Sequence, residues 1–139
     1  MEYIIYSDGG ARGNPGPAGF GFLIYKKNNK RPVASGKKYI GNATNNQAEY
    51  KGVIAALIKL YETDNHPTKV LVNLDSKLIV EQANGVYKVK SENIKPLYWE
   101  LQDIVKLLGI PIKFKHIPRE KNKEADKLVN EAIDLKISK

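Results

Sequence analysis

The fold is most readily predicted from the stretch Glu2-Tyr3-Ile4-Ile5-Tyr6-Ser7-Asp8, whose side chains alternate between two faces as in a β-strand. On this pattern Ile4, Tyr6 and Asp8 share one face, and Asp8 stands at the C-terminal end of the strand. The glycines and prolines of residues 9–19 favour turn backbone and interrupt a regular ladder of donors, so this segment is predicted to be a loop. The first element therefore carries a carboxylate to an edge of the predicted sheet.

The rest of the chain predicts a mixture of strands and helices. Apolar residues alternate in the strand segments and recur at i, i+3, i+4 and i+7 in the helices. No repeat, linker or low-complexity tract separates these elements, so one α/β domain spanning residues 1–139 is expected. Strands are predicted at residues 20–26, 33–40, 70–75 and 110–117, and helices at residues 46–61, 76–83, 93–108 and 122–135.

Three further acids occupy positions like that of Asp8. Glu49 lies at the start of a predicted helix, on the side of its apolar stripe. Asp75 ends the near-continuous apolar strand at residues 70–75, a pattern typical of a strand buried on both faces. Asp126 lies at the start of the last helix and also faces inward. In an open α/β sheet, strand ends and helix starts of this kind meet at one crevice, so the four carboxylates are expected to converge.

Converging carboxylates repel one another, and their pKa values rise unless a cation is present. The chain has no cysteine and two histidines, which excludes a thiolate metal site, a disulfide framework and a cysteine nucleophile. Oxygen ligands alone favour a hard cation, so Mg²⁺ or Mn²⁺ is expected in preference to zinc. The alternative is that each acid is a helix cap or a surface charge.

The composition is that of a soluble globular protein with a core, because 42% of the 139 residues are hydrophobic and 27% are charged. A net charge of +8 favours a polyanionic partner such as nucleic acid. No apolar run is long enough to cross a bilayer, and no signal peptide is recognisable at the start, so a cytoplasmic location without membrane contact is expected.

A short polar run, Thr44-Asn45-Asn46-Gln47, precedes the second acid. Thr44 or Asn45 is expected to cap the helix, and Asn122 is expected to cap the last helix. The same amides and hydroxyls at a helix N-terminus also suit phosphate oxygens and sugar hydroxyls. Capping and ligand binding both remain open for this run.

Four motifs stand along the chain: Tyr6-Ser7-Asp8-Gly9-Gly10, Thr44-Asn45-Asn46-Gln47-Ala48-Glu49, Leu74-Asp75-Ser76 and Asn122-Lys123-Glu124-Ala125-Asp126-Lys127-Leu128. Together they resemble those of the type 1 ribonuclease H family, in order and in spacing, over nearly the whole chain. The resemblance implies an α/β, ribonuclease H-like fold with a five-stranded mixed sheet, three antiparallel strands then two parallel, flanked by helices.

The resemblance also implies a function, the cleavage of the RNA strand of RNA/DNA hybrids to give 5′-phosphate and 3′-hydroxyl ends. Asp8, Glu49, Asp75 and Asp126 match the family's metal ligands. Two Mg²⁺ ions, roughly 4 Å apart and with Mn²⁺ as a substitute, would flank the scissile phosphate. Asp8 would bridge both ions, Glu49 and Asp75 would complete one side, and Asp126 would complete the other.

By the same matching, Asn14, Asn45 and Asn46 resemble residues that contact the minor groove and the 2′-hydroxyls of the hybrid. Thr44 and Asn93 resemble residues of a pocket that holds a phosphate of the DNA strand. Contacts in the wide minor groove of a hybrid can identify the RNA strand without reading its bases.

Many relatives carry a flexible loop, about ten residues before the last aspartate, with a histidine that assists turnover or product release. His116 has that spacing but lies within a strand pattern, so Arg119, just past Pro118, is the alternative candidate. There is also no room between Gly85 and Asn93 for the extra basic helix of several relatives, so affinity should rest on distributed lysines and depend on salt.

Two other functions remain open. One is a different nuclease or strand-transfer enzyme that uses the same acids on DNA junctions or ends, and the other is a non-catalytic nucleic-acid-binding module. The presence of all four acids argues against the binding module, and the asparagines matched to the minor groove argue against the DNA enzyme. The chain is expected to be a monomer.

Overall fold

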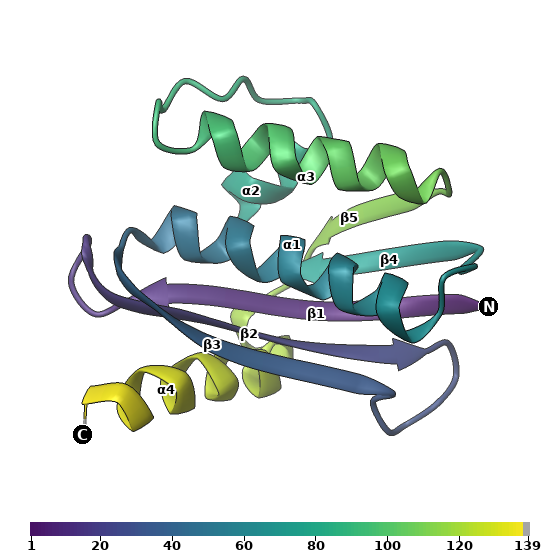
Figure 1. Cartoon of the computed structure of the whole chain (residues 1–139), viewed down its shortest axis with the longest axis horizontal. Coiled ribbons are helices and arrows are strands. Elements are labelled where there is room, and N and C mark those ends of the chain that lie inside the picture. The colour runs from purple at the N-terminus through teal and green to yellow at the C-terminus, as the bar shows by residue number, and fades with distance from the viewer. Residues whose placement is uncertain (138–139) are drawn as a thin grey trace.

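The computed structural model describes residues 1–137 and has five strands and four α-helices in that range (Figure 1). The strands form one sheet in the order β3-β2-β1-β4-β5. The strands are β1 (Glu2–Ala11), β2 (Gly16–Lys26), β3 (Ala34–Ala43), β4 (Lys69–Leu74) and β5 (Ile112–His116). The helices are α1 (Asn45–Thr63), α2 (Lys77–Ala83), α3 (Lys95–Leu108) and α4 (Lys123–Ile137), with a short 3₁₀ turn, η1 (Arg119–Lys121), before α4.

The pairing directions confirm the mixed sheet predicted from the sequence. β1 pairs antiparallel with β2, and β2 antiparallel with β3. On its other edge β1 pairs parallel with β4, and β4 pairs parallel with β5. The parallel pairing of β1 with β4 ends at Tyr6 opposite Asn73, which leaves the next residues of β1 beside the end of β4. That is the place where Asp8 lies.

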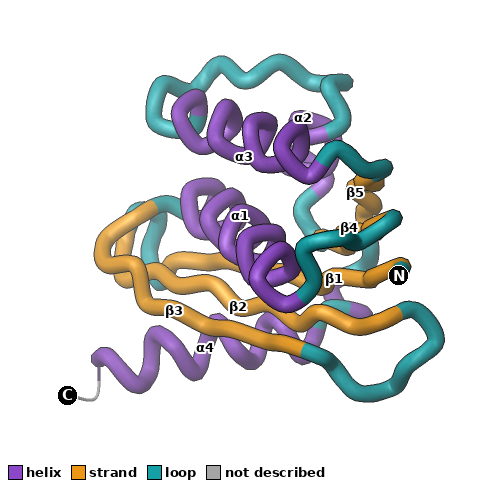
Figure 2. The backbone as a smooth tube through the Cα atoms, turned by 45° about the vertical axis from the view of Figure 1, so that its right-hand side comes forward, coloured by secondary structure: helices purple, strands orange, loops and turns teal. Residues whose placement is uncertain are grey.

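Helices cover the two faces of the sheet unequally (Figure 2). α1 packs on one face against β1, β2 and β3, and α3 packs on α1. α4 lies on the opposite face, against the same three strands. The main core forms between the sheet and α1, where Ile5, Ile24, Leu57 and Leu60 are fully buried. Apolar burial on this scale is the main stabilising term of the fold.

The glycine-rich segment at residues 9–19 is not a loop, and this prediction was wrong. β1 continues through Gly9 and Gly10 to Ala11, and only residues 12–15 form the turn into β2. Asp8 therefore lies within β1, opposite Gly21 of β2, and not at its end. Gly9 is glycine in this strand because the backbone of α1 approaches it too closely for a side chain.

The remaining boundaries differ from the predictions by a few residues, as is usual for element ends. α3 begins at Lys95 and not at Asn93, and the connection at residues 84–94 consists of turns and contains no helix. The absence of an extra basic helix in that connection is thus as predicted. None of the helices within residues 1–137 is both long and apolar enough to span a membrane.

Candidate active site

Three carboxylates meet beside the end of the parallel strands. Asp8 comes from β1, Glu49 from the first turns of α1, and Asp75 directly follows β4. One oxygen from each of them lies within 4.8 Å of the others. Asp8 and Glu49 are buried and Asp75 is half-buried. The convergence predicted from the sequence is therefore present for these three acids.

A glycine contact explains why the first two acids are so close. A Cβ atom built on Gly9 would lie 2.3 Å from the carbonyl carbon of Ala48 and 2.4 Å from the backbone nitrogen of Glu49. Such distances are far below van der Waals contact, so only glycine lets the start of α1 rest directly on β1. The helix then carries the Glu49 carboxylate to the Asp8 carboxylate.

Asp126 lies farther out on the same pocket. It belongs to the first turns of α4, and its side chain is 36% exposed. Gly21 of β2 seats this helix, because a Cβ there would lie 2.4 Å from the Cβ of Leu128. All four predicted acids line one pocket of about 440 Å³, which we call the acidic pocket. Asp126 is near enough that its charge helps to raise the pKa of Asp8.

Within the described residues, no basic side chain forms a salt bridge with the buried carboxylates of Asp8 and Glu49. Burial, followed by the charges of Asp75 and Asp126, raises the pKa of Asp8 to about 7. Burial and the neighbouring Asp8 raise the pKa of Glu49 well above the ordinary carboxyl value. Within residues 1–137 the buried Oε2 atom of Glu49 has no hydrogen-bond partner. Oxygen ligands of this kind, close together and without a cationic partner, fit a hard divalent cation.

The residues of the polar run before Glu49 have two different roles: two of them cap α1, and the other two line the acidic pocket. Thr44 and Gln47 form a reciprocal capping box at the start of α1, which settles the N-cap as Thr44. Asn45 and Asn46 line the acidic pocket. The Oδ1 atom of Asn45 accepts from the Ala11 backbone at 2.8 Å and so joins α1 to the end of β1.

The predicted substrate residues do not all lie together. The Oδ1 atom of Asn14 accepts from the Asn45 backbone at 3.0 Å, so Asn14 is beside the asparagine pair, on the turn between β1 and β2. Asn93 lies before α3, where Ser91 donates to its side chain, and is not among the residues that line the acidic pocket. Thr44 is the N-cap, directly behind the pair.

The two candidates for an assisting role differ in position. Arg119 lines the acidic pocket, and its Nη2 atom lies 3.9 Å from the Oδ1 atom of Asp126. Its side chain is 81% exposed and so has freedom to move toward a ligand. His116 is the last residue of β5, opposite Leu74, and is exposed outside the lining of the pocket. The geometry favours Arg119.

Residues 6–132 of the chain match the family model described as "Reverse transcriptase-like". The protein named Ribonuclease H from Chromobacterium violaceum is 30% identical over 144 residues, which cover 94% of this chain and 93% of that protein. This chain belongs to the ribonuclease H family. Its fold and its acidic motifs agree with the type 1 members of that family.

Two further ribonuclease H relatives are closer in sequence. The bifunctional protein Rv2228c of Mycobacterium tuberculosis is 42% identical over 137 residues, covering 96% of this chain but 36% of that protein. The chain therefore spans little more than a third of that relative's length. The structure of LC11-RNase H1, solved in complex with an RNA/DNA hybrid, superposes with a TM-score of 0.92 and 45% identity, covering 97% of this chain and 99% of that one.

One residue of this ribonuclease H site was not predicted from the sequence. Asn122 was predicted to cap α4, but its side chain does not do so. It is 1% exposed, and its Nδ2 atom donates to the Ser7 carbonyl at 2.9 Å and to the Oδ2 atom of Asp75 at 3.3 Å. Asn122 thus ties the start of α4 to β1 and to one of the acids. An asparagine directly before a helix has the same sequence pattern in either role.

Proposed function

We propose that this chain is an endoribonuclease that hydrolyses the RNA strand of RNA/DNA hybrids, leaving 5′-phosphate and 3′-hydroxyl ends. The observation that carries the proposal is the cluster of Asp8, Glu49 and Asp75, with an oxygen of each within 4.8 Å of the others, on a pocket that Asp126 also lines. Membership of the ribonuclease H family supports it. The relative of similar length that was solved with a hybrid supports the substrate class.

The four acids are proposed to hold two Mg²⁺ ions, with Mn²⁺ as a substitute. Asp8, Glu49 and Asp75 would hold one, and Asp8 and Asp126 the other. When bound, such ions lower the pKa of the attacking water and stabilise the leaving 3′-oxygen. Asp8 and Glu49 have raised pKa values, so they release protons when they bind a cation, and metal affinity should rise with pH.

Other polar side chains, some of them outside the acidic pocket, would bind and orient the hybrid. Asn45 and Asn46 present amides beside the acids, where they are suited to the minor groove and the 2′-hydroxyls, with Asn14 next to them. Thr44 and Asn93 are proposed to contact a phosphate of the DNA strand. The guanidinium of Arg119 would neutralise phosphate charge at the open side of the pocket.

A substrate panel with a matched variant tests this function. The wild-type chain is incubated with labelled hybrid, duplex DNA, duplex RNA and a DNA junction, with Mg²⁺, with Mn²⁺ and with a chelator. We expect metal-dependent cleavage of the RNA strand of the hybrid, which Asp8→Asn abolishes. Asp103→Asn, the same change at an exposed site on α3, should leave cleavage intact. Cleavage of junctions in preference to the hybrid, or activity in the chelator, would refute the proposal.

Residues 1–139 are proposed to act as one catalytic domain and as a monomer. The basic composition, with a net charge of +8, suits contacts to a nucleic-acid backbone. Light scattering of the metal-loaded chain measures the oligomeric state, and a dimer would contradict this part of the proposal.

A further inference from the structure

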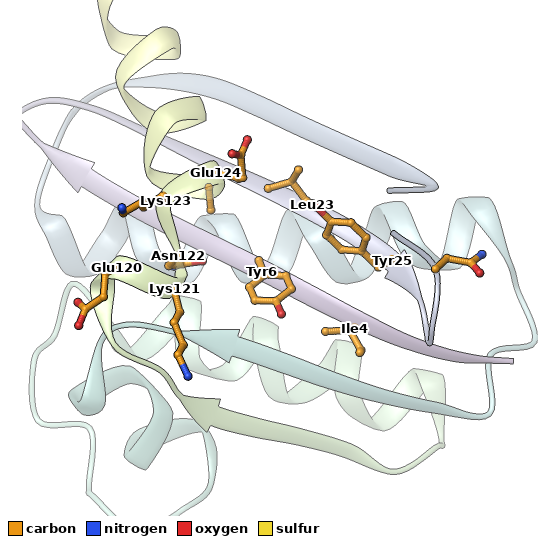
Figure 3. Close-up of a pocket in the computed structure, with 11 residues that line it drawn as sticks. Ile4, Tyr6, Leu23, Tyr25, Glu120, Lys121, Asn122, Lys123 and Glu124 are labelled. Carbon is orange, nitrogen blue, oxygen red and sulfur yellow. The ribbon is translucent and has the colours of Figure 1, made fainter. Parts of the chain in front are cut away.

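A second pocket, of about 370 Å³, is separated from the acidic pocket by the segment that leads into α4 (Figure 3). Its floor is formed by Ile4 and Tyr6 of β1 and by Leu23 and Tyr25 of β2. We call it the tyrosine pocket. Residues 120–125 form one wall of it, whereas Arg119 belongs to the acidic pocket, and the two pockets have no lining residue in common.

The floor of the tyrosine pocket offers aromatic surface to a ligand. The rings of Tyr6 and Tyr25 meet edge to face, with centroids 5.8 Å apart and planes at 87°. Both side chains are half-buried, although they lie on the sheet face that α4 covers. Figure 3 shows the ring of Tyr6 between that of Tyr25 on one side and Asn122 and Lys121 on the other. A volume of this size is within the range of about 300–1,000 Å³ that is common for small organic ligands.

The same face of the sheet carries a row of lysines. Strand register places Ile4 beside Leu71 and then Lys113, and it places Tyr6 beside Asn73 and then Lys115. Since paired residues point to the same side of a sheet, both lysines lie on the face of the tyrosines, and both are exposed.

Further charges surround the pocket itself. Lys121 and Lys123 lie in its wall with the acids Glu120 and Glu124, and all four are exposed. At the far end of the face, Lys27 is paired with Glu2 at 2.9 Å, while Lys69, opposite Glu2, is exposed as well. Lysines thus outnumber acids around an aromatic pocket, and this combination suits a polyanion that carries planar apolar groups.

We propose that the tyrosine pocket and its lysines bind single-stranded nucleic acid, with one unstacked base on Tyr6 and Tyr25 and the flanking phosphates on Lys113, Lys115 and Lys121. Sequence-tolerant single-strand sites in proteins combine these two elements, a basic track and aromatic rings. A duplex keeps its bases stacked and paired, so it cannot place one in the pocket. This site goes beyond the proposed hydrolysis, because the acidic pocket lies on the other side of the segment at residues 119–122.

The proposal is tested by the binding of a fluorescent single-stranded DNA oligonucleotide, which a ribonuclease does not cleave. Fluorescence anisotropy gives Kd at several salt concentrations for the full chain. Tyr25→Leu, which removes the ring but keeps apolar volume, should weaken binding about fivefold or more. Tyr25→Phe keeps the ring and should bind like the wild type. Tyr61→Leu, at an exposed tyrosine of α1, is the matched control and should have no effect.

The lysine row is tested in the same assay by salt dependence. The double variant Lys113→Gln/Lys115→Gln should weaken single-strand binding and reduce the slope of log Kd against log salt by about 1.4, because two phosphate contacts are lost. The matched double variant Lys59→Gln/Lys106→Gln, at exposed lysines of α1 and α3, lowers the net charge equally and should keep the wild-type slope.

A cross-link locates the bound base. An oligonucleotide with one photoreactive thiothymidine, irradiated with the wild-type chain, should label the peptide containing Tyr6 or the one containing Tyr25. Labelling of the acidic pocket alone, or Tyr25→Leu and lysine variants that bind single strands like the wild type while thermal melting shows them folded, would overturn the proposal. Concentration-dependent self-association that Tyr25→Leu abolishes, without single-strand binding, would overturn it as well and identify the face as a contact between copies.

Discussion

The acidic pocket and the tyrosine pocket stand side by side along β1 and differ in chemistry. Alternation along the strand puts Ile4, Tyr6 and Asp8 on the same side of the sheet. Tyr6, in the floor of the tyrosine pocket, is therefore only two residues away from the buried carboxylate of Asp8 in the acidic pocket. The segment at residues 119–122, which leads into α4, divides the two. One strand can thus contribute residues to two chemically different pockets when a segment from elsewhere in the chain separates them.

The two pockets also differ in what they do to stability. The acidic pocket gathers like charges in a buried place, which opposes folding unless a cation is bound. The tyrosine pocket has half-buried apolar groups, whose burial favours folding. Substitutions in the acidic pocket should therefore reduce activity without reducing stability, and those that damage the dividing segment should reduce both.

The largest effect is expected for Asp8→Asn or Asp75→Asn. Either change should abolish hybrid cleavage, a loss of about a thousandfold or more, because a metal ligand becomes a weaker one. The metal-free chain should be as stable as the wild type or more stable, since one charge leaves a repulsive cluster. Cleavage rates and melting temperatures in chelator measure the two effects. Near wild-type turnover in either variant would show that these acids are wrongly assigned.

The pH dependence of stability tests whether the buried charges of the acidic pocket oppose folding. The pKa of Asp8 is about 7 in the folded chain and about 4 when unfolded, so the folded state binds the proton more tightly. The metal-free wild type should therefore lose stability as pH rises from about 4 to about 7. Asp8→Asn should show a shallower fall, with Glu49 responsible for the remainder. Denaturant unfolding in chelator across that range gives both curves, and parallel curves would contradict the assignment.

Asn122→Ala should affect both activity and stability. The change removes the donor to Ser7 and to Asp75, so we expect a loss of about 1–3 kcal/mol of unfolding free energy and a loss of cleavage approaching a hundredfold. Asn84→Ala is the matched control, because its amide also donates to a backbone carbonyl, that of Phe114, away from the acids. A purely structural role for Asn122 predicts equal stability losses in the two variants and wild-type metal affinity in both.

Arg119→Ala should cost more than His116→Ala. Arg119 lines the acidic pocket, and loss of its charged hydrogen bond to phosphate should cost about 1–3 kcal/mol in kcat/KM. His116 is held at the end of β5, so its loss should change activity less than about tenfold. Both variants are measured on one hybrid at fixed salt. If His116→Ala is the more damaging and also removes a histidine-like limb from the pH profile, the catalytic role belongs to His116.

The smallest effect is expected for Asn45→Ala or Asn46→Ala. These amides are assigned to the hybrid and not to the metal, so cleavage should fall by about tenfold, mainly through KM, while Mg²⁺ affinity is kept. Calorimetric titration with Mg²⁺ separates the two. Equal losses of metal affinity and of activity would mean that the asparagines mainly hold the start of α1 on β1, as the contact from Ala11 to Asn45 suggests.

The three antiparallel strands and the meeting of Asp8, Glu49 and Asp75 could be predicted from local patterns, whereas the parallel pairing of the last two strands was implied by the family resemblance. Apolar alternation and helical spacing are set by neighbouring residues, and the topology of an open sheet then brings strand ends together. The four acidic motifs were also specific enough to indicate the family.

The errors arose where tertiary contacts override local preference. Glycine normally weakens a strand, so Gly9 and Gly10 were assigned to a loop, whereas both pair with β2 and Gly9 also lies directly against the backbone of α1. Asn122 was assigned to a cap because its partners, Ser7 and Asp75, lie far away in the sequence. The tyrosine pocket was not predicted either, since it depends on how far α4 extends over the sheet.

Because Gly9 contacts the backbone of α1, a substitution at this position offers protein engineering a way to move the Glu49 carboxylate. One added methyl group would have to move Ala48 outward and carry Glu49 with it, although no ionisable group would be altered. Replacing this glycine by alanine and then by serine would change the distance between the carboxylates of Asp8 and Glu49. Libraries that seek a changed metal preference can therefore vary residue 9 and keep the identity of all four acids unchanged.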